Sequence, residues 1–396
     1  MTETIRRTGI TPPLLLVLAL LASVAPFSTD LYLSAFPQMA DDLGVSATSI
    51  QLTLTSFLVG LAGGQLVFGP VSDRLGRRGP LLAGAVLFVV ASVGAVLAPT
   101  IELLIAARFV QGLAGAAGMV LGRAVIADLE RGEAAARAFS LMMIVGGIAP
   151  VIAPLAGSLI VDLVGWRAVL AVLVVLAVVM LLGSWFVVPE SLPPHRRGVQ
   201  RGRGMGAAAL LSRGFLSPAA TFVFAFSAMM AYISASPFLY QEVMGLDAVT
   251  YGGLFGVNAL GLAAASAAAT RLLRVSSTEK VLGLGVAGVV VGAVATLVVS
   301  VAGAPVGWLA LTIFVAVASL GGVMGPATAL ALGAVPGAAG SASAVLGAAQ
   351  FGFAAVVSPL VGLAGEQSTL PLGVVMAACA LLAAGAYLVG VRRPHA

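Results

Sequence analysis

Twelve apolar segments follow one another along this chain, and each is long enough to cross a bilayer as a helix of about 20 residues. Charged residues make up only 9% of the chain, against about 25% in a typical soluble domain, so no water-exposed surface can be built around one core. The sequence therefore predicts an all-α integral membrane protein with twelve transmembrane helices. The predicted spans are residues 12–35, 49–71, 80–98, 101–121, 139–161, 167–188, 215–240, 251–270, 281–301, 306–330, 342–365 and 370–391.

The positively charged side chains lie almost entirely on one side of this arrangement. Arg167 is on the opposite side, among acidic residues, and Arg108 lies within a span. All other Lys and Arg residues fall in the loops and termini of the first side, and such an excess marks the cytoplasmic face. Both termini are therefore predicted to be cytoplasmic, in a bacterial cytoplasmic (inner) membrane.

A polar segment, residues 189–213, divides the spans into two sets of six. It contains two consecutive prolines and five arginines, and is predicted to be a cytoplasmic linker between bundles 1–188 and 214–396. A short repeat in the fifth and eleventh spans supports two pseudo-symmetric bundles, because duplicated transporter folds pair corresponding helices. The repeat matches Gly147 and Pro154-Leu-Ala-Gly157 with Gly352 and Pro359-Leu-Val-Gly362.

The remaining composition excludes several other classes. The isoelectric point near 10 does not indicate a nucleic-acid-binding protein, because the basic residues sit in short loops rather than in one domain. Cys379 is the only cysteine, and His195 and His395 lack metal-ligand spacing, so neither a disulfide nor a metal site is expected. No segment reads G-x-x-x-x-G-K-[ST], which argues against direct use of ATP. No enzymatic activity, catalytic residue or cofactor is predicted.

Two ionisable residues, Asp30 and Arg108, lie well inside predicted spans. A charge at the bilayer centre costs about 2.5–3.5 kcal/mol even on the lenient insertion scale, so such residues usually face a partner or a watery cavity. A rise of 1.5 Å per residue places both roughly 10 Å below the outer surface, where they are expected to face each other across one cavity. The alternative for Asp30 is a cap on a frayed, water-exposed helix end, which Pro26, Ser28 and Thr29 would favour.

The most specific local pattern lies between the second and third spans and reads Gly69-Pro-Val-Ser-Asp73-Arg74-Leu-Gly76-Arg77-Arg78. Glycine at the first position would let two helices approach closely, and the second glycine permits a tight turn. The aspartate can accept from a helix N-terminus, and the arginines can bind carboxylates or anionic headgroups. An ordinary basic loop is the alternative, but the order G-x-x-x-D-R-x-G-R-R is too particular for it.

This segment resembles the signature loop of the major facilitator superfamily. Arg108-Phe-Val-Gln111-Gly112 is similar to the fourth-helix motif whose arginine that family links to proton coupling. The stretch from Ala149-Pro150 to Pro154-Leu-Ala-Gly157 resembles the fifth-helix motif of antiporters, with Ala-Pro in place of the usual Gly-Pro. These Ala-Pro pairs, together with Thr29-Asp30-Leu-Tyr32, resemble the Bcr/CflA subfamily of bicyclomycin and chloramphenicol exporters.

The resemblance implies a secondary transporter that exchanges a small organic drug, chloramphenicol-like or bicyclomycin-like, for protons by alternating access. The proton gradient would supply the energy, and the protein is expected to be a monomer. Asp30 and Arg108 would couple the protons, and Gly69, Asp73, Arg74, Gly76, Arg77 and Arg78 would form a conformational latch. Gly147, Pro150, Pro154 and Gly157 would form a bent and tightly packed antiporter helix that closes the cavity to leaks.

Other polar and aromatic residues inside the spans are candidates for substrate binding, namely Tyr32, Gln51, Tyr232, Phe238, Asn258, Gln350 and Phe351. Each has an alternative. Asn258 and Gln350 would equally serve to bridge helices, and Gln51 to pack one helix on another. Tyrosine at a membrane interface is more often an anchor than a ligand contact.

Two other functions stay open at this point. The first is proton-coupled uptake of a small metabolite, over which the proline-rich fifth helix favours export only through the family resemblance. A non-transporting membrane sensor or scaffold is the second alternative, and buried Asp30 and Arg108 argue against an inert one. The sequence does not indicate which drug is carried, how many protons accompany it, or which residues contact it.

Overall fold

The computed structural model describes residues 10–130, 132–194, 197, 210–335, 339–363, 365 and 368–391, and every regular element within them is helical. Eleven helices in these residues are long and apolar enough to cross a membrane. The count is twelve if the bent pair Pro12–Ala22 and Val24–Leu43, which meet at 43°, forms one span. The prediction of an all-α membrane fold is confirmed.

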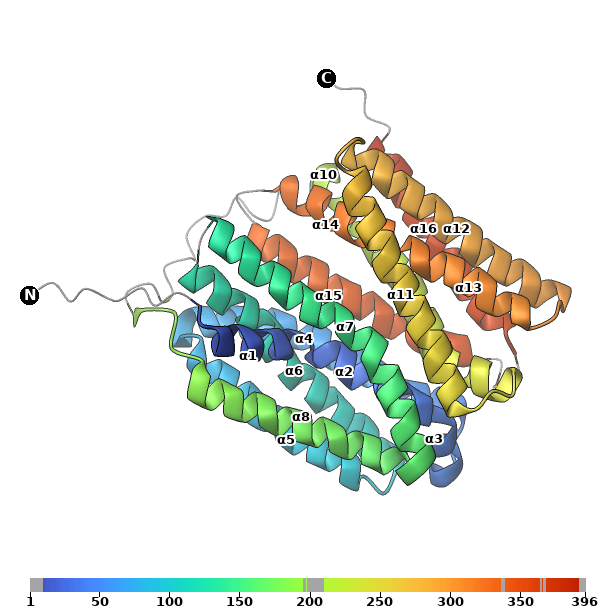
Figure 1. Ribbon diagram of the computed structural model, residues 1–396, viewed down its shortest axis with the longest axis horizontal. Helices are drawn as coiled ribbons and strands as arrows, with labels where there is room; N and C mark the ends of the chain where they lie inside the picture. Colours follow the sequence, from blue (N-terminus) through green and yellow to red (C-terminus); the bar gives the residue numbers. More distant parts are fainter. Residues whose placement is uncertain are drawn as a thin grey trace, which may run out of the picture.

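Two groups of helices lie side by side (Figure 1). The N half and the C half, as they are called below, meet along two pairs of helices, α4 with α15 and α7 with α11. The N half contains α1 Pro12–Ala22, α2 Val24–Asp30, η1 Leu33–Ala35, α3 Phe36–Leu43, α4 Ala47–Leu75, α5 Arg78–Leu97, α6 Ile101–Leu129, α7 Gly132–Val164 and α8 Trp166–Val187. The C half contains α10 Arg213–Phe238, η4 Leu239–Val243, α11 Ala248–Leu272, α12 Thr278–Ala302, α13 Gly307–Ser319, α14 Gly321–Gly333, α15 Ala339–Val357, η6 Ser358–Gly362 and α16 Leu370–Val391.

The first predicted span, residues 12–35, is not one straight helix. It is interrupted at Ser23 and again between Asp30 and Leu33, and α3 then extends the segment to Leu43. Proline accounts for part of this, because a ring inside a helix removes one backbone donor and clashes with a carbonyl of the preceding turn. Pro26 lies just after the first interruption and Pro37 just after the second. Asp30 is therefore the last residue of a short helix rather than a residue in mid-helix.

The signature segment also differs from the prediction, because most of it is helical. The second span was predicted to end at residue 71, but α4 continues to Leu75 and carries Gly69, Asp73 and Arg74 in its last turns. The turn itself is short, with Gly76 at φ 98°, a conformation that favours glycine. The end of an apolar run marks where the hydrocarbon layer ends. The helix itself continues beyond that point into water when polar partners stabilise its last turns.

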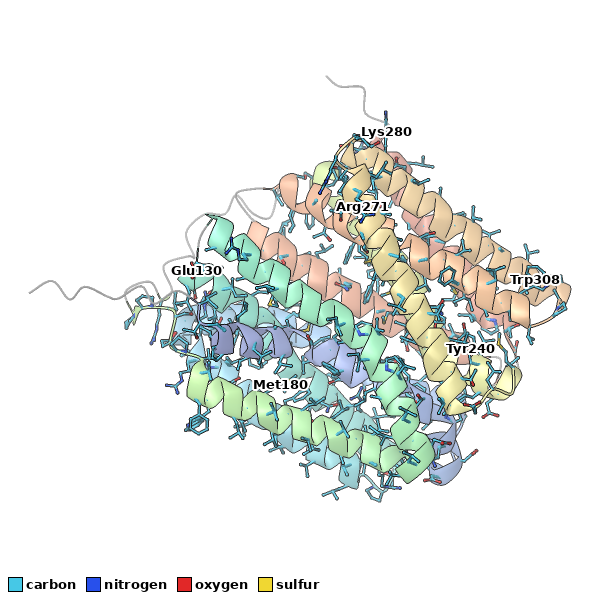
Figure 2. All side chains as sticks on the ribbon, in the orientation of Figure 1. Glu130, Met180, Tyr240, Arg271, Lys280 and Trp308 are labelled. Carbon is cyan, nitrogen blue, oxygen red and sulfur yellow. The ribbon has the colours of Figure 1, made fainter. Side chains whose placement is uncertain are left out.

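The ends of the bundle are distinguished by their side chains. Glu130, Arg271 and Lys280 lie toward one end, and Tyr240 and Trp308 lie toward the other (Figure 2). We call the first the inner end and the second the outer end, following the predicted cytoplasmic and periplasmic sides. Which end faces the cytoplasm stays a prediction from the distribution of Lys and Arg.

Candidate functional site

Arg108 is completely buried in α6 and is held against the end of α2. Its Nη2 donates to the backbone oxygen of Ser28, and its Nη1 donates to Oε1 of Gln111. The guanidinium carbon lies 4.2 Å from the ring centroid of Tyr32 and 4.5 Å from that of Phe57. The carbonyls in the last turn of a helix carry partial negative charge, and aromatic faces attract cations. The helix end and the two rings therefore take the place of a carboxylate partner.

Asp30 is also buried, with 4% of its surface exposed. The hydroxyl of Thr29 donates to its Oδ1 over 2.8 Å. No ion pair within 4.0 Å joins Asp30 to Arg108, both of which the structure describes. Arg108 binds the backbone oxygen of Ser28, two residues before Asp30, but the expected face-to-face pair with the Asp30 carboxyl is absent from this conformation. The alternative, in which Asp30 caps a frayed and water-exposed helix end, is right that Asp30 lies at a helix end. It is wrong about exposure, because the carboxyl is buried.

The candidates for substrate binding do not gather at one place. In the C half, Nδ2 of Asn258 donates to the hydroxyl of Tyr232 over 2.7 Å. Phe351 packs edge-on against Phe226 with ring centroids 5.7 Å apart, and Gln350 is half-buried beside it in α15. Tyr32 lies in the N half against Arg108. The two halves thus each contribute an aromatic and polar group, and no hydrogen bond between described residues joins Tyr32 to Tyr232 or Asn258.

Gln51 and Phe238 lie instead where the halves meet at the outer end. Three hydrogen bonds between described residues cross from one half to the other there, and we call these bonds the outer closure. Phe238 adds a contact with Phe36 at 6.2 Å between ring centroids. The bonds run from Thr48 Oγ1 to Gly362 O over 2.9 Å, from Gln51 Nε2 to Ser234 O over 3.2 Å, and from Gln241 Nε2 to Ser34 O over 3.2 Å. This conformation is therefore joined at its outer end.

At the inner end, Arg77 is the centre of a charge cluster. Its Nη1 lies 2.6 Å from Asp73 Oδ1 and 2.8 Å from Ser72 Oγ, and its Nε lies 2.9 Å from Asp128 Oδ2. Arg77 is only 6% exposed. Breaking a buried ion pair leaves an uncompensated charge and costs about 3–5 kcal/mol, so these contacts fix α4, α5 and α6 together.

Glu190 completes this inner charge cluster from the segment after α8. Its Oε1 accepts from the backbone N–H of Arg77 over 2.8 Å and of Leu192 over 3.0 Å, and its Oε2 lies 3.5 Å from Arg197. Partial burial by itself raises the pKa of Glu190, but the backbone donors of Arg77, Leu192 and Arg78 and the charge of Arg197 outweigh it, so the pKa lies below its usual value. Glu190 therefore ties the start of the predicted linker to the signature turn.

The other signature residues play smaller parts. Arg78 donates to the backbone oxygen of Trp185 over 2.8 Å, and Arg74 is exposed. A side-chain carbon added at Gly69 would meet nothing within 4 Å. The expectation that Gly69 allows two helices to approach closely is therefore not met in this conformation.

The position of Glu190 gives a pH-dependent prediction. Because its pKa is lower in the folded protein than the ordinary value of about 4.3, the carboxylate stabilises the fold above that value, and this contribution disappears as the pH falls through the folded pKa. We expect Glu190→Gln to lower the melting temperature at pH 7, with a difference that shrinks below about pH 4. Thermal unfolding of the purified protein measures this. Glu242→Gln, at an exposed residue of the outer end, is the control, and an equal effect of both variants would contradict the assignment.

The close contact of α7 lies at Gly157 rather than at Gly147. A side-chain carbon added at Gly157 would overlap the backbone oxygen of Leu31, whereas one added at Gly147 would meet nothing within 4 Å. Pro150 and Pro154 both lie inside α7. The backbone oxygen of Pro154 faces Gly252 of α11, so α7 packs on the broken first segment on one side and on the C half on the other. The expected tight packing is present, but Gly147 takes no part in it here.

Several contact residues were missed in the sequence. Gln111 lies in the quoted fourth-helix motif, one helical turn after Arg108, and that spacing is the signal that could have identified it. Asp128 and Glu190 lie beyond the predicted ends of their spans, in segments that a search within the spans passes over.

Solved structures of other transporters share the overall fold described above. The D-xylose–proton symporter has the same fold with a TM-score of 0.74, at 17% identity over 94% of this chain and 96% of that one. The nucleoside transporter NupG gives a TM-score of 0.73 at 14% identity, over 96% and 100% of the two chains.

Sequence relatives are more similar but shorter in alignment. The uncharacterized MFS-type transporter YdgK of Bacillus subtilis is 37% identical over 63% of this chain and 63% of its own length. The multidrug resistance protein MdtL of Shigella dysenteriae is 31% identical over 59% of this chain and 60% of its own length. The alignments thus span less than two thirds of these relatives. The family description that covers the larger part of the chain, residues 18–359, is that of the Major Facilitator Superfamily. The chain belongs to this superfamily, whose members are membrane transporters rather than enzymes.

Proposed function

We propose that the protein exports a small organic drug in exchange for protons. The observation that carries this proposal is Asp30, a carboxyl group that is 4% exposed, lies in the first membrane segment and has no basic partner among the described residues. Ionisable residues inside a membrane are costly and usually serve transport or proton transfer. The similarity to MdtL, a protein named for multidrug resistance, supports a drug as the substrate.

In this proposal Asp30 binds a proton that enters from the outer side. Its neutralisation removes a buried charge and so changes the free-energy difference between the two conformations. Arg108 stays fixed to the end of α2 through its bond to the backbone oxygen of Ser28. A chloramphenicol-like or bicyclomycin-like drug remains the substrate that the subfamily resemblance favours, with Tyr32, Tyr232 and Asn258 as candidate contacts. The setting is the bacterial cytoplasmic membrane, with the protein as a monomer.

The two ends of the bundle would alternate in opening. The outer closure holds the conformation described here. The inner charge cluster around Arg77 acts as the conformational latch that the family resemblance implies for the signature loop. The side chain of Asp73 is 42% exposed, so of the residues in the cluster it can most easily leave Arg77 for another partner. Proton-coupled uptake is the rival function, but the likeness to the D-xylose–proton symporter at 17% identity supports the fold alone.

Transport into everted membrane vesicles tests the proposal. With an acidic interior, we expect chloramphenicol added outside to accumulate within and to dissipate the proton gradient, because protons leave the vesicle as the drug enters. Vesicles without the protein are the control. A proton symporter would move substrate out of such vesicles, and a sensor or scaffold would move neither species, so either result would reject proton-coupled export of chloramphenicol.

A further inference from the structure

The outer closure contains two buried oxygen atoms that have no hydrogen-bond partner among the residues that the structure describes. They are Oε1 of Gln51 and Oγ of Ser34, and both belong to residues that also form a bond between the halves. Gln51 is 2% exposed and Ser34 is 1% exposed. Buried polar groups are almost always paired, and an exception calls for an explanation.

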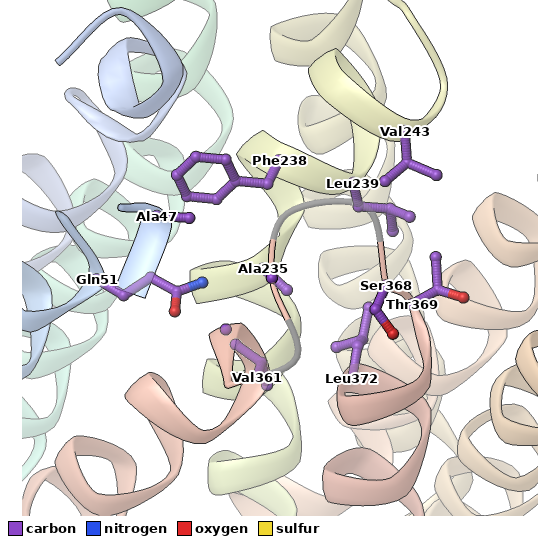
Figure 3. Close-up of a pocket in the computed structure, with 12 residues that line it drawn as sticks. Ala47, Gln51, Ala235, Phe238, Leu239, Val243, Val361, Ser368, Thr369 and Leu372 are labelled. Carbon is purple, nitrogen blue, oxygen red and sulfur yellow. The ribbon is translucent and has the colours of Figure 1, made fainter. Parts of the chain in front are cut away.

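The carboxamide of Gln51 reaches across to the C half. Its Nε2 donates to Ser234, while its Oε1 faces the Cα of Gly362, where a side-chain carbon would collide with it. The neighbouring walls are mostly apolar: Figure 3 shows the carboxamide of Gln51 beside Ala235, Phe238 and Val361 at the edge of a pocket of about 350 Å³, part of it open to the surroundings. When the outer end closes, this oxygen therefore leaves water for a site where no described residue donates to it.

The two ends of this side chain act on the closure in opposite directions. A hydrogen bond made on closing contributes about 1 kcal/mol, which favours the closed state roughly fivefold. A buried unpaired acceptor costs about 1–3 kcal/mol, which disfavours it by roughly 5- to 150-fold. Ser234 loses little on opening, because its oxygen lies within α10, where carbonyls also accept from the helix itself. Over most of this range the cost of the unpaired oxygen exceeds the contribution of the bond, so Gln51 favours opening.

We propose that Gln51 keeps the outer end in a closed state that opens readily, by burying one unpaired carbonyl oxygen in the closure. Thr48 and Gln241 supply the bonds that hold the halves together, and Gln51 offsets part of their effect. This assigns Gln51 to the conformational equilibrium rather than to the substrate. This inference depends on the proposed export in one respect: the outer end has to open during transport.

The rate of thiol labelling at the outer end tests whether Gln51 favours or disfavours opening. Cys379 is the only cysteine, so Cys379→Ala gives a background for the reporter Ala235→Cys, at a residue that is 8% exposed and lines the pocket beside Gln51. The rate of reaction with a membrane-impermeant maleimide added from the outer side, without drug, reports opening. We expect Gln51→Leu to slow labelling at least about fivefold, because it removes the unpaired oxygen and adds apolar contact.

Further variants and a control complete the experiment. Gln51→Glu at pH 8 should accelerate labelling by about fivefold or more, since a buried carboxylate costs more than an amide. Gln51→Met also removes the carboxamide and should slow labelling, so it decides the question if the leucine variant does not fold. Thr55→Val should change the rate by less than about twofold, because that hydroxyl donates to Gln51 O within the same helix.

Faster labelling of Gln51→Leu would show that the bond to Ser234 dominates and would overturn the proposal. Equal labelling rates in the Gln51→Leu and Gln51→Glu variants would overturn it as well. Labelling is measured without drug or proton gradient. A failure of the vesicle assay would therefore reject drug export while leaving this result standing.

Discussion

Replacing Asp30 by asparagine should reduce drug-driven proton movement in reconstituted vesicles to the level of vesicles without protein. Asparagine has the size of aspartate and still accepts a hydrogen bond from Thr29, so the segment should fold and insert as before. It cannot bind and release a proton, which removes the step that couples the two fluxes. A pH-sensitive dye inside the vesicles measures the effect, and equilibrium binding of chloramphenicol should persist.

Two further variants give this experiment its control. Asp30→Glu keeps a titratable group and should retain part of the exchange. Asp162→Asn removes an exposed carboxylate near the end of α7 and should leave the exchange unchanged. Normal proton movement in a well-inserted Asp30→Asn variant would mean that another group carries the proton.

Adding a single methyl group at Gly157 should have the second largest effect. The new carbon would overlap the backbone oxygen of Leu31, one residue after Asp30, and backbone cannot rotate away as a side chain can. Overpacking of this kind costs about 1–3 kcal/mol, so Gly157→Ala should lower the melting temperature and displace the segment that carries Asp30. Drug export should fall strongly as a result.

Gly147→Ala is the matched control on the same helix. Nothing lies within 4 Å of the added carbon, and alanine is the better helix former by about 1 kcal/mol. Its melting temperature should stay the same or rise. If both variants behave alike, the contact between α7 and Leu31 is not what positions the first segment.

The sequence predicts the helices well because a bilayer leaves the backbone few choices. Every N–H and C=O group in the hydrocarbon must be paired within the segment, so an apolar run of sufficient length becomes a helix, as α16 does over the predicted residues 370–391. The ends are less predictable. α4 and α6 continue past their apolar runs because Arg77 pairs with Asp73 and Asp128, and such pairing over distance has no signature in hydropathy.

The candidate site is predicted in its components but not in its contacts. Asp30 and Arg108 are identifiable because charges are rare inside spans. Arg108 binds the end of α2 instead of Asp30, and such a bond to a backbone oxygen has no signature in the sequence. Gln51 illustrates the same limit, since amide groups can serve a ligand or a helix contact and only the facing residues, Ser234 and Gly362, distinguish the two.

The bond from Glu190 to the signature turn changes where the N half ends as a separable unit. Glu190 and Leu192 follow α8, yet Glu190 contacts the turn between α4 and α5. A fragment cut at residue 188 would therefore lack the acceptor for the N–H groups of Arg77 and Arg78, whereas one cut after Arg197 would retain it. If the two halves are produced as separate polypeptides for reassembly in the membrane, the junction belongs after Arg197 and not at the end of the last helix.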